Sequence, residues 1–510
     1  MRSADAFYVT TPIYYVNDSP HIGHAYTTLA CDTLARFARL DGRAVRFLTG
    51  TDEHGQKVEK AAAAAGLAAQ DFTDQVSQRF RTLGERMQLT NDDFIRTTEA
   101  RHKRAVQALW RELRARDEIY LGTYAGWYSV RDEAFYAESE LVDGRAPTGA
   151  TVEWVEEPSY FFRLSAWQEP LLRFYEEHPD FILPPARRNE VVSFVRGGLQ
   201  DLSVSRTSFD WGVEVPDDPE HVVYVWLDAL TNYISAVGYP DEGDELYRTF
   251  WPADLHVIGK DILRFHAVYW PAFLLAAGLE PPRRVFAHGW WTVEGEKISK
   301  SLGNVIDPYE LIDSYGLDQT RYFLLREVPF GNDGDFSRAA MISRMNRDLA
   351  NDYGNLVQRV LSLIQRNCDG RLPARGDLAA ADRSLLEAAE GLLGRVRESM
   401  ANQALSRALE QVFEVIGDAN RYVDATAPWA LRKTDPPRMA TVLAVLAEVI
   451  RKVALITQAF MPDASARILD QLGVPPERRE LSAYPSDAGG LEPGTPLPKP
   501  AGVFPRYQTT

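Results

Sequence analysis

Short apolar runs alternate with helical patterns through residues 5–120. The expected strands are Phe7–Thr10, Ala44–Leu48 and Phe94–Thr98, and the expected helices run to Leu40 and over Lys57–Ala64, Phe72–Met87 and Arg101–Arg114. Alternation of this kind is typical of an α/β fold with a doubly wound parallel sheet. Such a sheet binds its ligand beyond the carboxyl ends of its strands. His21, Asp52 and His54 follow expected strands, so we expect the chemistry at that edge.

The first strand leads through a proline-containing loop into a helix that opens at about Pro20. Asp18 or Ser19 is the expected N-cap, and His21-Ile-Gly-His24 falls in the first turn. Helix N-termini present unpaired N–H groups to phosphates, and two imidazoles add donors there. Gly23 would let a flat ring lie against the helix backbone. Alone, the tetrapeptide is equally consistent with ordinary helix capping.

A second candidate phosphate site lies late in the chain, at Gly295-Glu-Lys-Ile-Ser-Lys-Ser-Leu-Gly-Asn304. Lys297 and Lys300 stand three residues apart, and glycines flank them. This composition suits a loop that closes over a triphosphate, although one such loop could also be a solvated surface segment. The occurrence of both motifs in one chain, in this order, favours nucleotide chemistry.

The two motifs resemble the signatures of class I aminoacyl-tRNA synthetases, with Ile298 in place of the usual methionine. The surrounding sequence is similar to the methionyl-tRNA synthetases, and the matching stretches are Thr10–Asn17, Phe47–Gly55, Tyr224–Ala229 and Ile258–His266. The resemblance runs from residue 7 to about residue 475. It implies a Rossmann-type catalytic fold that activates L-methionine with ATP and Mg²⁺ and transfers it to tRNA(Met).

Residue roles follow from this resemblance. The implied catalytic residues are His21, His24, Lys297 and Lys300. The implied ATP-binding residues are Gly23, Gly259, Lys260, Asp261, Lys297, Ser299 and Lys300, with Asp261 a candidate for the ribose hydroxyls. The implied methionine-binding residues are Ile13, Tyr15, Asp52, Trp226, Ala229, Leu230, Tyr233, Ile262 and His266. The sequence does not decide whether Trp270 belongs to the core or to the pocket edge.

The family's anticodon residues match Asn355, Arg359 and Trp429. Asn355 and Arg359 are four residues apart and therefore share a helix face. Splayed-out bases are read by aromatic stacking and planar donors, which these side chains supply. Without the family, the pair would be an ordinary surface pair and Trp429 a residue of a bundle core.

Many members of the family carry a zinc knuckle built from Cys-x-x-Cys pairs in an insertion. In this chain Ser129 and Asp132 stand at the first pair, and no second pair follows in residues 144–150. Zinc sites of this kind need thiolates. We therefore expect no metal, and a knuckle held by apolar packing of Trp127, Tyr128 and Phe135.

We expect five segments in the 510-residue chain. They are a first catalytic half (1–117), a connective-peptide insertion (118–222), a second catalytic half (223–337), a helical anticodon-binding bundle (338–475) and an extended Pro/Gly-rich tail (476–510). The insertion is expected to contain strands at Tyr120–Tyr128, Thr151–Glu156 and Tyr160–Leu164. The parallel sheet is expected to resume at Val222–Trp226, Leu255–Ile258 and Arg284–His288. Expected bundle helices are Met345–Gln365, Asp382–Glu398, Asn402–Asp424 and Arg438–Phe460. No further folded module is expected after the tail, which favours a monomer.

The composition of the chain limits the partners and the cell compartment that we expect. The net charge of −16 does not favour a nucleic-acid binder, although residues 341–375 hold six arginines against three aspartates. Two cysteines exclude a disulfide framework, and no apolar run is long enough to span a membrane, so we expect a cytoplasmic protein.

Two other functions remain open from the residues. Small nucleotidylyltransferases carry a similar histidine motif on shorter chains without a helical bundle. A tRNA-binding protein that has lost catalysis is the second alternative, and the complete histidine and lysine motifs argue against it.

Overall fold

The computed structural model describes residues 5–16, 20–132, 134–136, 138–297 and 305–508. They form two compact units. Unit 1 comprises the chain up to Pro20 together with Val45–His288, and unit 2 comprises His21–Ala44 together with Gly289 onward. No helix among the described residues is long and apolar enough to cross a membrane.

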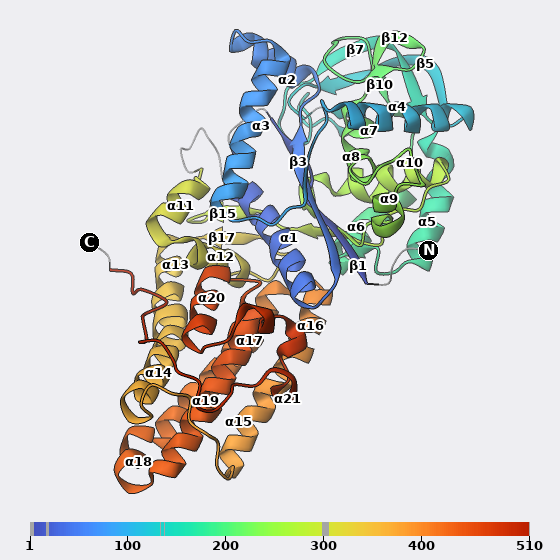
Figure 1. Ribbon diagram of the computed structural model, residues 1–510. Helices are drawn as coiled ribbons and strands as arrows, with labels where there is room; N and C mark the ends of the chain where they lie inside the picture. The colour runs from blue at the N-terminus through green and yellow to red at the C-terminus, as the bar shows by residue number, and fades with distance from the viewer. Residues whose placement is uncertain (1–4, 17–19, 133, 137, 298–304, 509–510) are drawn as a thin grey trace. The chain divides into compact units, whose positions relative to one another are not determined.

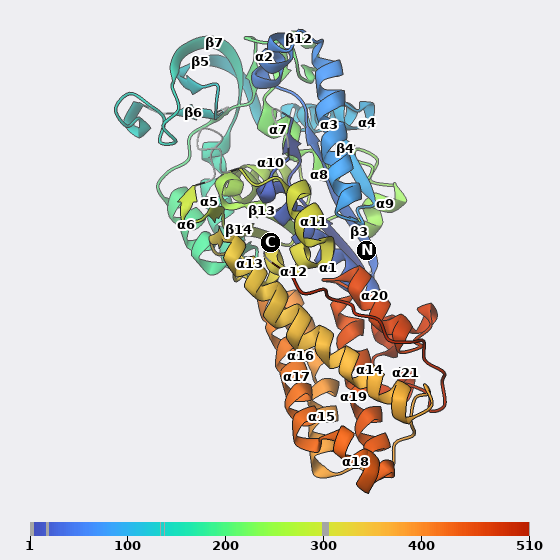
Figure 2. The same cartoon turned by 90° about the vertical axis from the view of Figure 1, so that its left-hand side faces the viewer.

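Unit 1 is built on a parallel sheet with the strand order β2-β3-β1-β13-β14-β8, and β4 also pairs with β3. Figure 1 labels β1 and β3 of this sheet, and Figure 2 labels β4, β13 and β14. The strands are β1 (Ala6–Thr10), β2 (Tyr14–Tyr15), β3 (Ala44–Asp52), β4 (Asp93–Arg96), β8 (Ile182–Leu183), β13 (Leu255–Gly259) and β14 (Val285–His288). The register pairs Val9 with Leu255 and His256 with Val285, both in parallel. The predicted α/β fold with a parallel sheet is confirmed.

Helices of unit 1 pack on the sheet around one large core. They are α2 (Gln56–Ala64), α3 (Ala69–Arg86), α4 (Ala100–Ala115), α5 (Gln168–Glu177), α6 (Pro185–Arg196), α7 (Val225–Leu230), α8 (Asn232–Ser235), α9 (Glu245–Phe250), the turn η3 (Lys260–Ile262), the π-helix η4 (Phe265–Tyr269) and α10 (Trp270–Ala276). Tyr8, Leu48, Trp110 and Phe162 belong to the core. Trp270 is fully buried in it, which places this side chain in the core.

A four-stranded antiparallel sheet, β6-β5-β7-β9, follows α4. Its strands are β5 (Ile119–Ser129), β6 (Ala134–Tyr136), β7 (Glu153–Phe162) and β9 (Leu202–Ser203). The sequence predicted two strands where β7 is continuous. Pro158 does not interrupt β7, because it pairs with Thr123 of β5 while β9 pairs only at Phe161 and Phe162.

The prediction that the parallel sheet resumes at Val222–Trp226 is wrong. β12 (Asp218–Val223) pairs in antiparallel fashion with β10 (Ser205–Arg206) and β11 (Glu214–Val215) in a separate sheet. Val225 already begins α7. An apolar run of this length fits a strand or a buried helix, and periodicity alone does not separate them.

Unit 2 begins with α1 (Ile22–Leu40), which contacts α12 (Leu317–Arg326). The buried guanidinium of Arg321 donates to Asp32 on α1 (2.8 Å) and to the carbonyl of Phe460 (2.9 Å). A small sheet, β16-β15-β17, comprises β15 (Trp291–Val293), β16 (Glu296–Lys297) and β17 (Gly334–Phe336). α11 (Pro308–Tyr315) precedes α12.

The second half of unit 2 is a helical bundle, in which α17 contacts α16 and α19 (Figures 1 and 2). Its helices are α13 (Arg338–Arg344), the π-helix η6 (Met345–Gly354), α14 (Asn355–Asn367), α15 (Ala380–Glu390), α16 (Leu392–Ala401), α17 (Leu405–Thr426), α18 (Pro428–Thr434), α19 (Pro436–Thr457) and α20 (Pro462–Gln471). The predicted helical bundle is confirmed. One predicted helix, Asp382–Glu398, is two helices that meet at Gly391.

The tail packs on unit 2 along a largely irregular path with short helical turns. Leu372 N–H donates to the carbonyl of Thr495 (3.0 Å), and Tyr507 N–H donates to the side chain of Asn346 (2.8 Å). The ring of Phe504 lies 5.7 Å from that of Tyr353 between centroids.

Candidate active site

Two histidines cap the N-terminus of α1. His21 is the N-cap residue, and its Nδ1 accepts from Gly23 N–H (3.1 Å). His21 N–H donates in turn to Nδ1 of His24 (3.1 Å), so the pair forms a reciprocal capping box. The prediction of an N-cap at Asp18 or Ser19 is wrong, because α1 begins at Ile22; these two residues lie outside the described ones.

This capping arrangement fixes the state of both rings. Each Nδ1 accepts a backbone N–H, so each neutral ring carries its hydrogen on Nε2. The ring centroids are 3.9 Å apart, and burial together with His21 holds the pKa of His24 well below its usual range. Gly23 makes the arrangement possible, since a Cβ there would lie 2.9 Å from Cε1 of His21.

Residues on either side of the lysine motif contact α1 within unit 2. On one side, Trp291 of β15 packs edge-to-face on Tyr26, with centroids 5.4 Å apart. On the other side, Ile306 accepts a hydrogen bond from Ile22 N–H (3.2 Å). Lys297 ends β16. Ser299 and Lys300 lie outside the described residues.

The predicted methionine residues all lie in unit 1. At the sheet edge, the register of β2 and β3 pairs Tyr15 with Asp52, which is 7% exposed. The Tyr15 hydroxyl donates to the carbonyl of His54 (3.1 Å). Ile13, between β1 and β2, packs half-buried against the large core.

A second group of these residues comes from α7, α8 and η3. Ala229 and Leu230 are buried, while Trp226 and Ile262 are half-buried against the core. The indole of Trp226 stacks on the ring of Phe265, with centroids 3.6 Å apart and planes 7° from parallel. This stack presents a flat aromatic wall, which sulfur contacts favourably.

Tyr233 and His266 form a buried hydrogen-bonded pair. His266 Nδ1 lies 3.0 Å from the carbonyl of Ile262 and therefore donates to it. Its Nε2 consequently accepts from the Tyr233 hydroxyl, 2.7 Å away. Burial lowers the pKa of His266 to about 4, so the ring is neutral near pH 7.

A buried carboxylate that sequence reasoning missed joins three elements of this region. Asp228 of α7 accepts from His54 Nδ1 (2.6 Å) and from His102 Nε2 of α4 (2.7 Å). Burial would raise the pKa of Asp228, but the two histidines outweigh burial and lower it to about 2. His54 follows Asp52 closely, and Asp228 lies between Trp226 and Ala229, so the cluster connects the sheet edge to α7.

The predicted adenosine residues follow β13. Gly259 ends the strand, and Lys260 and Asp261 begin η3. A Cβ at Gly259 would lie 2.5 Å from Oδ1 of Asp261, so the close approach of this carboxylate requires glycine. Asp261 is exposed.

The three predicted anticodon residues include two that are in contact in unit 2. The guanidinium of Arg359 lies 5.5 Å from the ring centre of Trp429 and pairs with Asp424 (2.9 Å). Trp429 is 48% exposed, which excludes a place in the bundle core. Asn355 is exposed at the start of α14, on the same helix as Arg359. Ala427 adopts a left-handed conformation (φ 42°) where α18 begins.

Comparisons with known proteins cover nearly the whole chain. The family model of class I (M) tRNA synthetases matches residues 7–153 and 140–361, and that of the anticodon-binding domain of methionyl tRNA ligase matches residues 372–508. The methionine–tRNA ligase of Rhizobium meliloti is 55% identical over 512 residues, which cover 99% of each chain. The chain belongs to the methionyl-tRNA synthetase family.

Solved structures of this methionyl-tRNA synthetase family agree. The Mycobacterium tuberculosis methionyl-tRNA synthetase in complex with methionyl-adenylate has a TM-score of 0.96 and 55% identity, covering 99% of this chain and 100% of the other. The apo form of the M. tuberculosis enzyme has a TM-score of 0.90 and 51% identity, covering 100% and 99%.

The knuckle in the insertion is held partly by hydrogen bonds, which the prediction of apolar packing omitted. Asp132 N–H donates to Ser129 Oγ (3.2 Å), and the Asp132 carboxylate accepts from Tyr136 (3.1 Å) and Thr148. Partial burial acts to raise the pKa of Asp132, but these donors and Arg131 lower it. Within the described residues, no group of three or more His, Cys, Asp and Glu side chains is placed to hold a metal.

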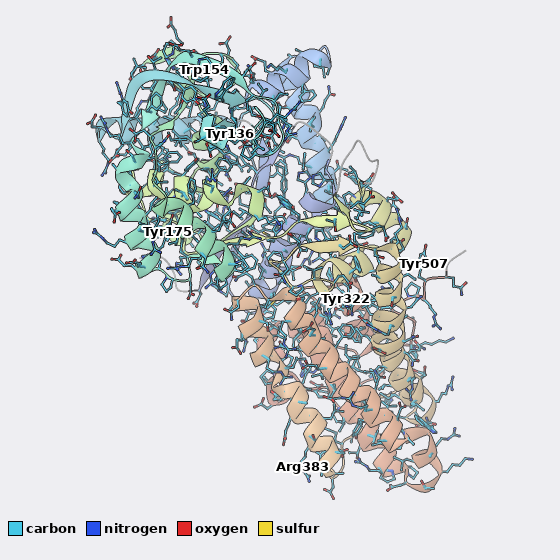
Figure 3. The ribbon with its side chains drawn as sticks, turned by 180° about the vertical axis from the view of Figure 1, so that it is seen from behind. Tyr136, Trp154, Tyr175, Tyr322, Arg383 and Tyr507 are labelled. Carbon is cyan, nitrogen blue, oxygen red and sulfur yellow. The ribbon has the colours of Figure 1, made fainter. Side chains whose placement is uncertain are left out.

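Aromatic packing supports this part of the chain. Trp127 of β5 packs edge-to-face on Trp154 of β7, with centroids 5.3 Å apart. Tyr128 is buried, while Trp154 remains 54% exposed on its strand (Figure 3).

Proposed function

We propose that this chain activates L-methionine with ATP and transfers the methionyl group to the 3′ end of tRNA(Met). In the first step a methionine carboxylate oxygen attacks the α-phosphorus and pyrophosphate leaves. In the second step the terminal ribose hydroxyl attacks the carbonyl carbon of the adenylate and AMP leaves. The observation that carries the proposal is that Asp52, the Trp226 stack and the Tyr233–His266 pair belong to one unit.

Methionine binding draws on three features of unit 1. The Asp52 carboxylate and the Ile13 backbone accept from the ammonium group. Trp226, Ala229, Leu230 and Ile262 line the thioether. The neutral Tyr233–His266 pair adds a polar wall that presents no charge to the side chain.

The α1 histidines act as neutral donors toward the phosphates. Nε2–H of His21 and of His24 can each donate to oxygens whose charge grows as the α-phosphorus becomes pentacoordinate. Neutral donors fit a helix N-terminus, where backbone N–H groups already favour anions. Because both partners of the reaction are anions, positioning and charge stabilisation contribute more than a protein base.

The ATP-binding residues come from three stretches of the chain. Gly259, Lys260 and Asp261 contact adenosine, with Asp261 on the ribose hydroxyls, and Gly23 lies beside the base. Lys297, Ser299 and Lys300 close over the β- and γ-phosphates, and the contacts of Trp291 and Ile306 with the α1 region support this role. Mg²⁺ enters as the ATP complex, because it binds phosphate oxygens and retains its waters.

Anticodon recognition belongs to the bundle. Trp429 stacks on a splayed-out base, and Arg359 and Asn355 donate to base edges. Each segment of the chain has its own part in this function. Residues 1–117 and 223–337 form the two catalytic halves, and residues 118–222 form the insertion between them. Residues 338–475 bind the anticodon, and residues 476–510 form the tail. The enzyme acts as a cytoplasmic monomer without zinc.

One assay tests the activation step. Exchange of labelled pyrophosphate into ATP should require methionine, and tRNA(Met) should then accept methionine. Exchange without methionine would indicate a nucleotidylyltransferase. Absence of exchange in folded protein that still binds tRNA would indicate a scaffold that has lost catalysis.

A further inference from the structure

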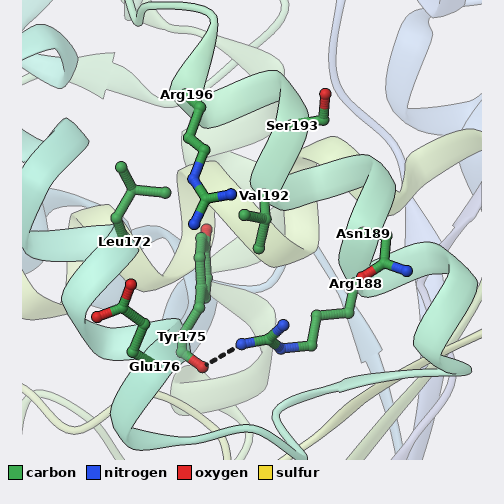
Figure 4. Close-up of a pocket in the computed structure, with 8 residues that line it drawn as sticks. All are labelled: Leu172, Tyr175, Glu176, Arg188, Asn189, Val192, Ser193 and Arg196. Carbon is green, nitrogen blue, oxygen red and sulfur yellow. Dashed lines mark hydrogen bonds between the residues drawn. The ribbon is translucent and has the colours of Figure 1, made fainter.

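A pocket of about 380 Å³ lies between α5 and α6 of unit 1 (Figure 4). Its lining is Leu172, Tyr175, Glu176, Arg188, Asn189, Val192, Ser193 and Arg196. Arg188, Val192 and Arg196 are spaced by four residues and share one face of α6. Figure 4 shows both guanidinium groups directed into the space toward α5.

The two arginines of this pocket have no carboxylate partner among the residues that the structure describes. Arg188 donates one hydrogen bond, to the carbonyl of Tyr175 (2.8 Å), and its buried Nε has none. Arg196 is exposed on α6, and its guanidinium pairs with no carboxylate in the described part of the chain. The neighbouring Arg187 contrasts with them, since it pairs with Glu190 (2.8 Å). In a chain of net charge −16, two unpaired guanidinium groups facing one space indicate an anion site.

Two contacts connect the walls of the pocket to η4 and to the residue before it, and η4 carries His266 of the candidate methionine site. The hydroxyl of Tyr175, at the pocket wall, donates to the carbonyl of Ala267 in η4 (2.6 Å). Ala267 directly follows His266. On the other side, the guanidinium of Arg264 lies 3.9 Å from the ring centre of Phe194 on α6. An anion bound here would therefore sit against the elements that carry His266.

We propose that this pocket binds a phosphodiester group of the tRNA backbone. The planar guanidinium fork matches two phosphate oxygens, and Asn189 and Ser193 add neutral donors. Glu176 reduces the lining charge to +1, which suits a singly charged phosphodiester better than pyrophosphate or a triphosphate. The inference rests on the proposed function, because transfer of methionine brings the 3′ end of tRNA to unit 1.

The test compares tRNA binding by wild type, Arg188→Gln, Arg196→Gln and the double variant over a range of salt concentrations. Affinity for tRNA falls as salt rises, and each lost phosphate contact should reduce the magnitude of the slope of log affinity against log salt by about 0.9. Methionine-dependent pyrophosphate exchange should stay within about twofold of wild type, because these residues contact neither methionine nor ATP. Arg173→Gln is the matched control, since Arg173 is exposed on α5 and does not line the pocket.

A second pair of variants, Arg188→Lys and Arg196→Lys, keeps the charge and removes the fork. These variants should retain most of the salt slope and lose affinity. A pyrophosphate-exchange rate and a melting temperature equal to those of the wild type would show that each variant is folded. Slopes equal to that of Arg173→Gln would overturn the proposal.

Inorganic phosphate separates the two sources of the anion. Saturable phosphate binding that the double variant abolishes, with an unchanged tRNA salt slope, would assign the pocket to free phosphate and overturn the tRNA assignment. Failure of wild type to charge tRNA would instead contradict the proposed function, and the phosphate arm would still report on the pocket.

Discussion

Nδ1 of His54 lies 2.6 Å from a carboxylate oxygen of Asp228, although 174 residues separate them in the chain. Both side chains are buried, and His102 donates to the other oxygen. Asp228 is thereby charged at neutral pH and holds α7 against the loop that follows Asp52. The two residues link the expected ammonium site to the expected thioether wall.

Replacing Asp228 with Asn should impair methionine use more than ATP use. An amide cannot accept from both histidines, so one buried donor loses its acceptor, at a cost of about 1–3 kcal/mol. We expect the KM for methionine in pyrophosphate exchange to rise about 5- to 150-fold at that energy, with the KM for ATP little changed.

Asp228→Glu and Asp218→Asn serve as comparisons for this variant. Glu keeps the charge and should restore part of the methionine affinity. Asp218 lies on β12, outside the cluster, and its variant should behave as wild type. Equal losses for methionine and ATP in Asp228→Asn would show that the carboxylate only stabilises the fold.

Gly23→Ala should slow adenylate formation. The new Cβ would lie 2.9 Å from the His21 ring and displace it from its capping position. We expect the single-turnover rate to fall about 10-fold or more, because small displacements of positioning groups are costly. Gly394→Ala, where nothing lies within 4 Å, is the matched helix control and should keep the wild-type rate. A wild-type rate for both variants would contradict a role for His21.

Elements with clear local periodicity were predictable from the sequence. The helix that ends at Leu40 and the strands at Phe7–Thr10 and Leu255–Ile258 were confirmed, because apolar spacing is a local signal. The helical bundle followed from the same signal. The site residues were proposed from motifs, and their roles stay predictions.

Features that depend on distant partners were not predictable. The Asp228 cluster joins α7, α4 and the loop that holds His54, which no local pattern connects. The sequence prediction assigned β12 to the wrong sheet, because the residues of a strand do not show which strand it pairs with. The His21–His24 capping box uses imidazole nitrogens where Asp or Ser would be the ordinary choice.

Trp429→Ala should impair tRNA charging and leave methionine-dependent exchange unchanged. Loss of a base–aromatic stack costs roughly 1–3 kcal/mol, so kcat/KM for tRNA should fall about 5- to 150-fold. The side chain is half exposed, and its removal opens no core cavity. Trp429→Phe retains a ring and should recover most of the charging. If exchange fell together with charging, the indole would be structural.

Purified protein should contain no stoichiometric zinc by elemental analysis. Ser129 and Asp132 form a hydrogen-bonded turn in place of thiolate ligands. Treatment with a chelator followed by Mg²⁺ should therefore restore full exchange activity. Asp132→Ala should lower the melting temperature, because Tyr136 and Thr148 lose their acceptor. One zinc per chain would refute the expectation.

Asp318→Asn should stabilise the protein at alkaline pH and have little effect in acid. Burial raises the pKa of Asp318 from 3.8 to about 6, and the charge of the nearby Asp463 contributes to this rise. The raised pKa means that folding favours the protonated form of Asp318. The stability that the folded state gains from this preference is complete below pH 3.8 and is lost as pH rises through 6. Asn retains an acceptor for Ala464 N–H, which lies 2.5 Å from the carboxylate. The melting temperature should therefore rise at pH 8 and converge with wild type near pH 4, whereas the exposed Asp377→Asn should show no such difference. An equal shift at both pH values would exclude ionisation of Asp318 as the cause.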